Sequence, residues 1–136
     1  MIPVAKKILV VDDERHIVRL VQVNLERAGY EVIIAYDGVV ALEKAEREKV
    51  DMVITDDWMP RMNGFELLEK LRSGDQFPDI PVIMLGASNQ DAHIFQAYSS
   101  GVTSHFTKPF DPKQILAAVQ RIFSLYGDEG FLGPAS

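Results

Sequence analysis

Five short runs of apolar, largely β-branched residues recur along this chain, and amphipathic stretches separate them. Such runs are typical of buried strands, whereas apolar residues at helical spacing are typical of the helices that cover a sheet. The regular alternation favours an α/β fold with a parallel sheet, in which each strand is followed by a helix. The five runs are KILVV (7–11), EVIIA (31–35), DMVIT (51–55), PVIML (81–85) and VTSHF (102–106).

The stretches between these runs carry helix start and stop signals. The first has Ile17, Val18, Val21, Leu25 and Ala28 at helical spacing, and Gly29 follows as a stop. Caps are expected from Asp37, from Asn63 with Glu66, from Ser88 with Asp91, and from Asp111-Pro112 with Gln114. The last helix is expected to bury Ile115, Val119 and Ile122 and to end near Tyr126. Right-handed crossovers then predict a doubly wound (βα)5 three-layer sandwich.

Length and composition narrow the function classes. The 136 residues predict one domain, which we place at 1–126, with a tail or linker at 127–136. A net charge of -6 gives no basic face for direct nucleic-acid binding. There is no cysteine and no apolar stretch near the about 20 residues that span a bilayer, so we expect a cytoplasmic protein without membrane contact.

Charged side chains stand where three of the predicted strands end. Asp12 and Asp13 follow the first run, Asp56 follows the third and Lys108 follows the fifth. The carboxyl ends of parallel strands share one edge of the sheet, so these residues are expected to converge on one crevice. There the acids would hold a metal and the lysine would meet a phosphoryl oxygen. Taken singly, each has a simpler explanation as a helix cap or a loop residue.

The motifs VVDDE, TDDWMPRMNGFELL and TKPF give the chain a resemblance to the receiver domain of two-component response regulators over about residues 6 to 125. The resemblance implies a flavodoxin-like sheet of strand order 2-1-3-4-5. It implies that Asp56 is the phosphoacceptor, that Asp12 and Asp13 are the acidic pair, and that Lys108 is the catalytic lysine. It also implies a cis peptide bond between Lys108 and Pro109.

The chemistry of these residue types agrees with the resemblance. Clustered carboxylates raise one another's pKa unless a cation neutralises them, and Mg²⁺, for which Mn²⁺ may substitute, favours oxygen ligands. The expected ligands are Asp13, Asp56, the backbone carbonyl of Trp58 and a water-linked Asp12. Asp56 would attack phosphorus while Lys108 stabilises charge on the transferred group. The donor implied by the resemblance is a sensor histidine kinase or a phosphotransfer protein.

Two switch positions depart from the family pattern. Gly86 stands where a threonine or serine hydroxyl normally meets the phosphoryl group, and His105 stands where a tyrosine or phenylalanine is usual. Ser88, which flanks the site with Ala87 and Pro109, or a water molecule is expected to replace the missing hydroxyl. For His105, tolerance of a histidine on a half-exposed strand is favoured over pH sensing.

The surroundings of the site leave further alternatives open. Trp58 either shields the phosphoryl group from water or only packs on the surface. Ile94 and Tyr98 belong either to the core or to a partner face that the resemblance places on the fourth helix, fifth strand and last helix. That face is expected to bind an output protein or domain, or a second copy in a homodimer.

The leading interpretation is a phosphoaccepting receiver that acts on itself and turns over no external substrate. The main alternative is a pseudo-receiver that binds partners without phosphorylation, which Gly86 and His105 favour. A flavin-binding module would need a phosphate-cradling loop after the first strand, where this chain has the acidic DDER. An aspartyl phosphatase would need a second acid two residues after the nucleophile, where this chain has Trp58.

Overall fold

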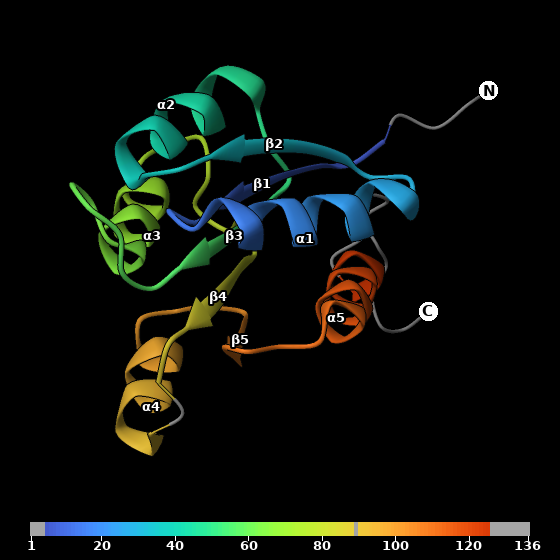
Figure 1. Ribbon diagram of the computed structural model, residues 1–136. Coiled ribbons are helices and arrows are strands. Elements are labelled where there is room, and N and C mark those ends of the chain that lie inside the picture. Colours follow the sequence, from blue (N-terminus) through green and yellow to red (C-terminus); the bar gives the residue numbers. More distant parts are fainter. Residues whose placement is uncertain (1–4, 89, 126–136) are drawn as a thin grey trace.

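The computed structural model describes residues 5–88 and 90–125, and in this part of the chain five strands alternate with five helices (Figure 1). The strands are β1 (Lys7–Val11), β2 (Glu31–Ala35), β3 (Met52–Asp56), β4 (Val82–Gly86) and β5 (Ser104–Thr107). The helices are α1 (Arg15–Arg27), α2 (Gly38–Glu48), α3 (Gly64–Ser73), α4 (Asp91–Ser99) and α5 (Pro112–Leu125).

The strands form one parallel sheet of order β2-β1-β3-β4-β5. The predicted fold class and strand order are therefore confirmed. The order reverses direction after β1, because the chain goes first to β2 and then returns past β1 to β3. A crevice at the carboxyl ends of the strands, beside such a reversal, is the usual ligand site of open α/β sheets.

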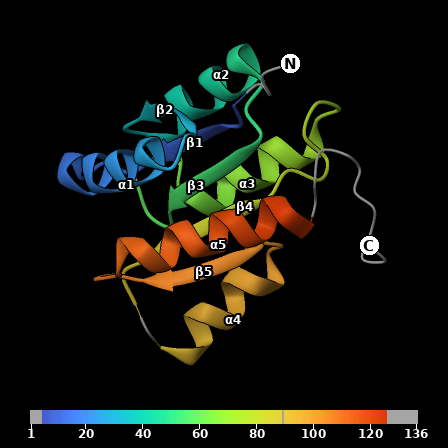
Figure 2. The ribbon, with the colours of Figure 1, turned by 90° about the vertical axis from the view of Figure 1, so that its right-hand side faces the viewer.

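Helices cover both faces of the sheet, which gives three layers (Figures 1 and 2). On one face α1 and α5 bury Val18, Leu25 and Ile115 against β1, β3 and β4. On the other face α2, α3 and α4 bury side chains that include Ala41 and Leu67. The central strands are buried on both faces, which explains why their sequences are continuous apolar runs rather than alternating ones.

The predicted helix caps are confirmed at three positions. The Asp37 carboxylate accepts a hydrogen bond from the Val40 N–H, and Asn63 forms a full capping box with Glu66. The Asp111 carboxylate accepts from the Lys113 N–H at 2.9 Å, directly before the first residue of α5.

The cap predicted at Ser88 is wrong. Helix α4 begins at Asp91, and its N-cap is Gln90, which makes no side-chain cap. The Ser88 hydroxyl instead accepts a hydrogen bond from the Gln90 N–H at 3.1 Å. This local hydrogen bond uses the hydroxyl three residues before the helix starts, in competition with the capping role.

The boundaries of the predicted domain and tail are not all visible. Residue 126, where the last helix was expected to end, and the tail at 127–136 lie outside the described residues. Helix α5 is described to Leu125 and buries Ile115, Val119 and Ile122 as predicted. Within the described residues, no helix is both long enough and apolar enough to cross a membrane.

Candidate functional site

Charged residues from three strands meet at the carboxyl edge of the sheet because backbone hydrogen bonds continue beyond the strands. The Asp12 N–H donates to the Ala35 carbonyl at 3.3 Å, and the Asp57 N–H donates to the Leu85 carbonyl at 3.1 Å. The Lys108 N–H donates to the Gly86 carbonyl at 2.8 Å. These bonds hold the residues that follow β1, β3 and β5 in the register of the sheet.

Lys108 reaches across this edge and contacts three carboxylates. Its ammonium Nζ lies 2.8 Å from Asp12 Oδ2, 3.0 Å from Glu14 Oε1 and 3.4 Å from Asp56 Oδ1. Burial alone would lower the pKa of Lys108, but the bonds to Asp12 and Glu14 and the charge of Asp56 outweigh it and raise the pKa. Lys108 therefore carries a positive charge at neutral pH. The Lys108–Pro109 peptide bond is cis, as the resemblance implied.

The acids at this edge form a compact cluster. Asp12, Asp13 and Asp56 each offer a carboxylate oxygen, and these atoms lie within 4.8 Å of one another. Asp12 is fully buried and Asp56 is 5% exposed, whereas Asp13 is exposed. Asp12 Oδ2 accepts no hydrogen bond of good geometry, although Lys108 lies beside it.

This crowding changes the protonation of the buried acids. Burial, reinforced by the charge of Asp12, raises the pKa of Asp56 to about 8. Burial also raises the pKa of Asp12, against the opposing effect of Lys108. The single positive charge of Lys108 therefore does not neutralise the negative charge of the carboxylate cluster. The cluster fits a hard divalent cation such as Mg²⁺ or Mn²⁺, because all its potential ligand atoms are oxygens. One of these, on a buried carboxylate, also lacks a hydrogen bond.

The loop after Asp56 is held tightly against the strand. Met59 is buried, and Arg61 Nη2 lies 2.8 Å from Asp37 Oδ2, which ties this loop to the start of α2. A Cβ on Gly64 would collide with the backbone carbonyl of Asp56, so only glycine allows α3 to begin this close to the site. Trp58, between these anchors, has 67% of its surface exposed.

The two atypical switch positions lie next to each other. Gly86 is the buried last residue of β4, and the ring of His105 covers it from β5. The flanking residues Ala87 and Pro109 are exposed. Sequence reasoning treated Gly86 and His105 as two separate departures, since nothing in the pattern of the sequence predicts that the ring leans along the strand. Phe106, the next residue of β5, packs against the core instead.

Glu14 was missed as a member of the site. It directly follows the acidic pair and precedes α1, and its carboxylate pairs with Lys108. Lys108 holds the pKa of Glu14 below its usual value. The signal was the third acid in the run VVDDE, of which sequence reasoning assigned a role only to Asp12 and Asp13.

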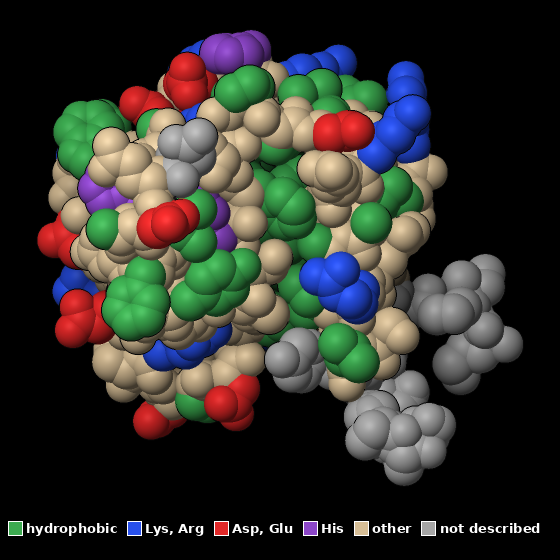
Figure 3. Space-filling model, turned by 90° about the horizontal axis from the view of Figure 1, so that it is seen from below, with side chains coloured by type: hydrophobic (Ala, Val, Ile, Leu, Met, Phe, Trp, Pro, Cys, Tyr) green, Lys and Arg blue, Asp and Glu red, His purple; other side chains and the backbone are tan. Residues whose placement is uncertain are grey.

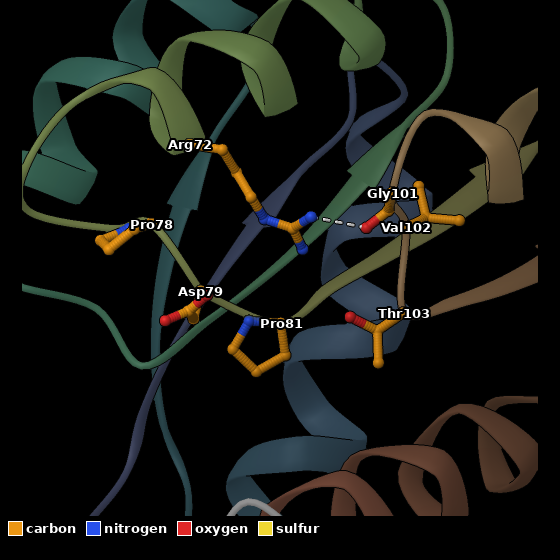
Figure 4. Close-up of a pocket in the computed structure, with 7 residues that line it drawn as sticks. All are labelled: Arg72, Pro78, Asp79, Pro81, Gly101, Val102 and Thr103. Atoms are coloured by element: carbon orange, nitrogen blue, oxygen red, sulfur yellow. Dashed lines mark hydrogen bonds between the residues drawn. The ribbon is translucent and has the colours of Figure 1, made fainter.

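A separate hollow of about 630 Å³ lies at the opposite edge of the sheet, beside the amino ends of β4 and β5 (Figure 4). Arg72 crosses it, donating to the Gly101 carbonyl at 2.7 Å and to the Ile80 carbonyl at 2.8 Å. Both contacts join α3 to the loops that lead into β4 and β5. This arginine therefore stabilises the fold and is not part of the acidic site.

Helix α4 exposes large hydrophobic side chains. Phe95 is 72% and Tyr98 is 49% exposed, while Ala97 is the buried residue of this helix. Figure 3 views the molecule from the side of α4 and shows hydrophobic side chains gathered on this surface. The alternative that assigned Tyr98 to the core is therefore wrong. Ile94 is half-buried, so both of its interpretations stand.

The fold and the acidic edge agree with what comparison with known proteins finds. The model of the response regulator receiver domain family matches residues 8–120. The chain belongs to the response regulator receiver domain family, which consists of signalling domains of two-component systems.

Similar proteins include both short and long regulators. The chain is 40% identical to chemotaxis protein CheY1 of Helicobacter pylori, over 79% of this chain and 88% of that protein. It is 44% identical to the alkaline phosphatase synthesis transcriptional regulatory protein PhoP of Bacillus subtilis, over 86% of this chain and 48% of that protein. The chain thus spans about half the length of PhoP.

Solved structures show the same architecture. Chemotaxis protein CheY4 of Vibrio cholerae is 36% identical, with a TM-score of 0.81 over 88% of this chain and 99% of that one. A CheY-like receiver domain of Methanospirillum hungatei is 30% identical, with a TM-score of 0.84 over 93% of this chain and 100% of that one.

Proposed function

We propose that this chain is a phosphoaccepting receiver in which Asp56 takes a phosphoryl group from a histidine kinase or a phosphotransfer protein. The observation that carries the proposal is the buried Asp56 carboxylate, with the Asp12 and Asp13 carboxylates on one side and the Lys108 ammonium 3.4 Å away. A carboxylate nucleophile, which a bound cation would keep ionised, next to a fixed ammonium and an acid cluster suited to a metal is the arrangement that phosphoryl transfer requires.

In the proposed reaction, an Asp56 Oδ atom attacks the phosphorus of a phosphohistidine. The new O–P bond forms as the N–P bond breaks, and the donor imidazole leaves with the electron pair. Lys108, whose raised pKa keeps it charged, contacts the oxygens of the transferred group and stabilises their negative charge. Mg²⁺, when bound, screens the carboxylates from the incoming anion and stabilises charge on the same oxygens.

The proposed metal ligands are Asp13 and Asp56 directly, Asp12 through water, and the Trp58 backbone carbonyl. Asp12, Asp13 and Asp56 have the spacing for this role. The Trp58 carbonyl stays a prediction from the resemblance. Manganese should replace magnesium because the donor set is made of oxygen atoms.

The proposed partners follow from the class of protein. A histidine kinase is the expected donor, and a relative named hybrid signal transduction histidine kinase D, from Dictyostelium discoideum, is 34% identical over 92% of this chain. The expected output surface is the face made by α4, β5 and α5, where Phe95 and Tyr98 are exposed. Through this face the receiver would bind an output protein or domain, or a second copy of itself.

A pseudo-receiver that binds its partners without phosphorylation is the second candidate function. The observation that favours it is Gly86, which offers no hydroxyl to a phosphoryl group. The intact acids and Lys108 favour the phosphoaccepting receiver instead, because a site without phosphoryl chemistry has no need for buried, mutually repelling carboxylates.

The test is intact-mass analysis after incubation with acetyl phosphate and Mg²⁺. A single phosphoryl adduct is expected in the wild type and in Asp57→Asn, and none in Asp56→Asn. Asp57→Asn is the matched control because it removes the neighbouring carboxylate. Absence of the adduct in the wild type, both with acetyl phosphate and with a phosphorylated histidine kinase, would favour the pseudo-receiver.

A further inference from the structure

The side chain of His105 occupies the space that a side chain at position 86 would need. The position of a Cβ on Gly86 lies only 2.5 Å from His105 Nε2 and 3.2 Å from His105 Cε1. Real Cβ atoms do not approach other heavy atoms at 2.5 Å, so the imidazole ring and a larger residue 86 exclude each other in this arrangement. Glycine at 86 is therefore what lets the ring lie here.

The ring faces the acidic edge. His105 pairs with Met84 in the sheet, so its backbone lies two residues before the end of β4, but its ring reaches forward to Gly86 at the carboxyl end. Asp57 Oδ2 lies 3.3 Å from the same Cβ position on Gly86. The imidazole thus stands in the corner between the end of β4 and the residue that follows Asp56.

The backbone of His105 is held from the other side. Its N–H donates to the Tyr98 hydroxyl oxygen at 3.2 Å, which connects β5 to α4. The residue is half-buried. The backbone tie to α4 and the position of the ring over Gly86 orient the imidazole toward the site.

An imidazole in this corner offers a hydrogen-bond donor, as a threonine or serine hydroxyl would. An ionised carboxylate only accepts hydrogen bonds, whereas a neutral imidazole presents one N–H. Nε2 is the ring atom nearest to the Cβ position on Gly86, so the tautomer with the proton on Nε2 would place the donor in this corner. An anion on Asp56 would then find a donor on this side, opposite the ammonium of Lys108.

We propose that His105 takes the place of the missing hydroxyl and that its Nε2–H donates a hydrogen bond to an oxygen of the phosphoryl group carried by Asp56. The inference rests on the proposed function. It makes Gly86 and His105 one functional unit, in which a donor from β5 replaces a donor from β4. No covalent bond forms or breaks in this contact.

Ser88 is the competing candidate for the same role. Its hydroxyl already accepts a hydrogen bond from the Gln90 N–H at 3.1 Å, in a turn that leads away toward α4. The ring of His105 already lies over Gly86. The geometry therefore favours His105, and Ser88→Ala becomes a comparison that separates the two.

The first experiment observes the ring in the unmodified protein. Nitrogen NMR of the histidine side chains is recorded with Mg²⁺, before and after addition of beryllofluoride, which mimics a phosphoryl group on a carboxylate. The His105 Nε2 signal is expected to shift and its proton to become protected from exchange, while the exposed His93 stays unchanged. Asp56→Asn should abolish the response. An unaltered His105 signal in beryllofluoride-bound wild type would overturn the proposal.

The second experiment measures beryllofluoride affinity through the fluorescence of Trp58. His105→Phe keeps the ring but removes the donor, and it should bind roughly tenfold more weakly, the usual effect of one hydrogen bond. The double variant Gly86→Thr with His105→Ala should recover the loss, because alanine leaves the space of the ring empty and a threonine hydroxyl can then occupy it. His93→Phe and Ser88→Ala are the controls and should bind like the wild type.

The outcomes separate this inference from the function on which it rests. Wild type that neither binds beryllofluoride nor accepts a phosphoryl group would overturn both. Wild-type binding with an equally strong His105→Phe variant would overturn only the role of His105. A loss in Ser88→Ala in place of His105→Phe would assign the contact to Ser88.

Discussion

At the residue scale, the central feature is that one lysine forms ion pairs with several carboxylates. Lys108 contacts Asp12, Glu14 and Asp56, yet burial still raises the pKa of Asp56 to about 8. The site is thus short of positive charge when no metal is bound. That shortage is what the proposed divalent cation would make up.

Removing the lysine should therefore destabilise the metal-free protein. Lys108→Met leaves Asp12 and Asp56 without their cation, and we expect a loss of about 1–3 kcal/mol in the free energy of unfolding. Urea unfolding measures it. Lys113→Met, an exposed lysine in α5, is the control and should change stability little. Equal effects of the two substitutions would contradict the account of the charge cluster.

Trp58 yields a prediction about the lifetime of the phosphoryl group. It lies two residues after the proposed acceptor and its side chain is 67% exposed. If it shields the phosphoryl group, as one of its two interpretations holds, it hinders an attacking water molecule. Trp58→Asn should shorten the lifetime of the adduct, as measured by the decay of the phosphorylated mass after the donor is removed. A lifetime that stays the same or grows would leave surface packing as the role of this tryptophan.

At the element scale, the sequence predicted the order and type of the described strands and helices, because apolar periodicity and capping residues are local signals. The exception among the helix starts is α4, whose predicted cap at Ser88 is wrong. Strand β3 continues to Asp56 and β4 to Gly86, one residue beyond each predicted run. The missed contacts, Glu14 with Lys108 and His105 over Gly86, join side chains from elements far apart in sequence. Local sequence patterns do not predict the orientation of such side chains.

The start of α3 gives a prediction of its own. Gly64→Ala would push a methyl group against the backbone carbonyl of Asp56, which cannot move aside as a flexible side chain would. We expect a loss of about 2 kcal/mol or more in stability, together with weaker phosphorylation, because Asp56 itself would shift.

The control for that prediction is Gly74→Ala, at the C-cap of the same helix. A Cβ there meets only the Lys70 carbonyl, at 4.0 Å, and its φ of -89° suits any residue. Gly74→Ala should be neutral or slightly stabilising in the same unfolding and phosphorylation assays. Equal tolerance of both alanines would show that the site does not depend on this close approach.

At the scale of the whole molecule, the acidic edge makes stability depend on pH. The pKa of Asp56 is raised from 3.8 to about 8 in the folded protein. Between these values the folded state binds more protons than the unfolded state, so stability falls as the pH rises through about 8. The lowered pKa of His105 changes stability only below its ordinary value of 6.5, so it does not contribute between about pH 7 and pH 9.

We therefore expect the metal-free protein to unfold at a lower temperature at about pH 9 than at about pH 7. Saturating Mg²⁺ should raise the unfolding temperature most at the higher pH, because the cation binds the deprotonated cluster. Asp56→Asn removes the titrating group and should flatten the dependence in the metal-free protein. Thermal scans that stay independent of pH in the wild type would contradict the raised pKa.

The most direct test of the account locates the phosphoryl group on the chain. The protein is incubated with acetyl phosphate and Mg²⁺, reduced with borohydride, which converts an aspartyl phosphate to homoserine, and mapped by peptide mass spectrometry. The account predicts homoserine at position 56 and unmodified aspartate at positions 12, 13 and 57. Modification at Asp57 or at another acid with Asp56 left intact would contradict it.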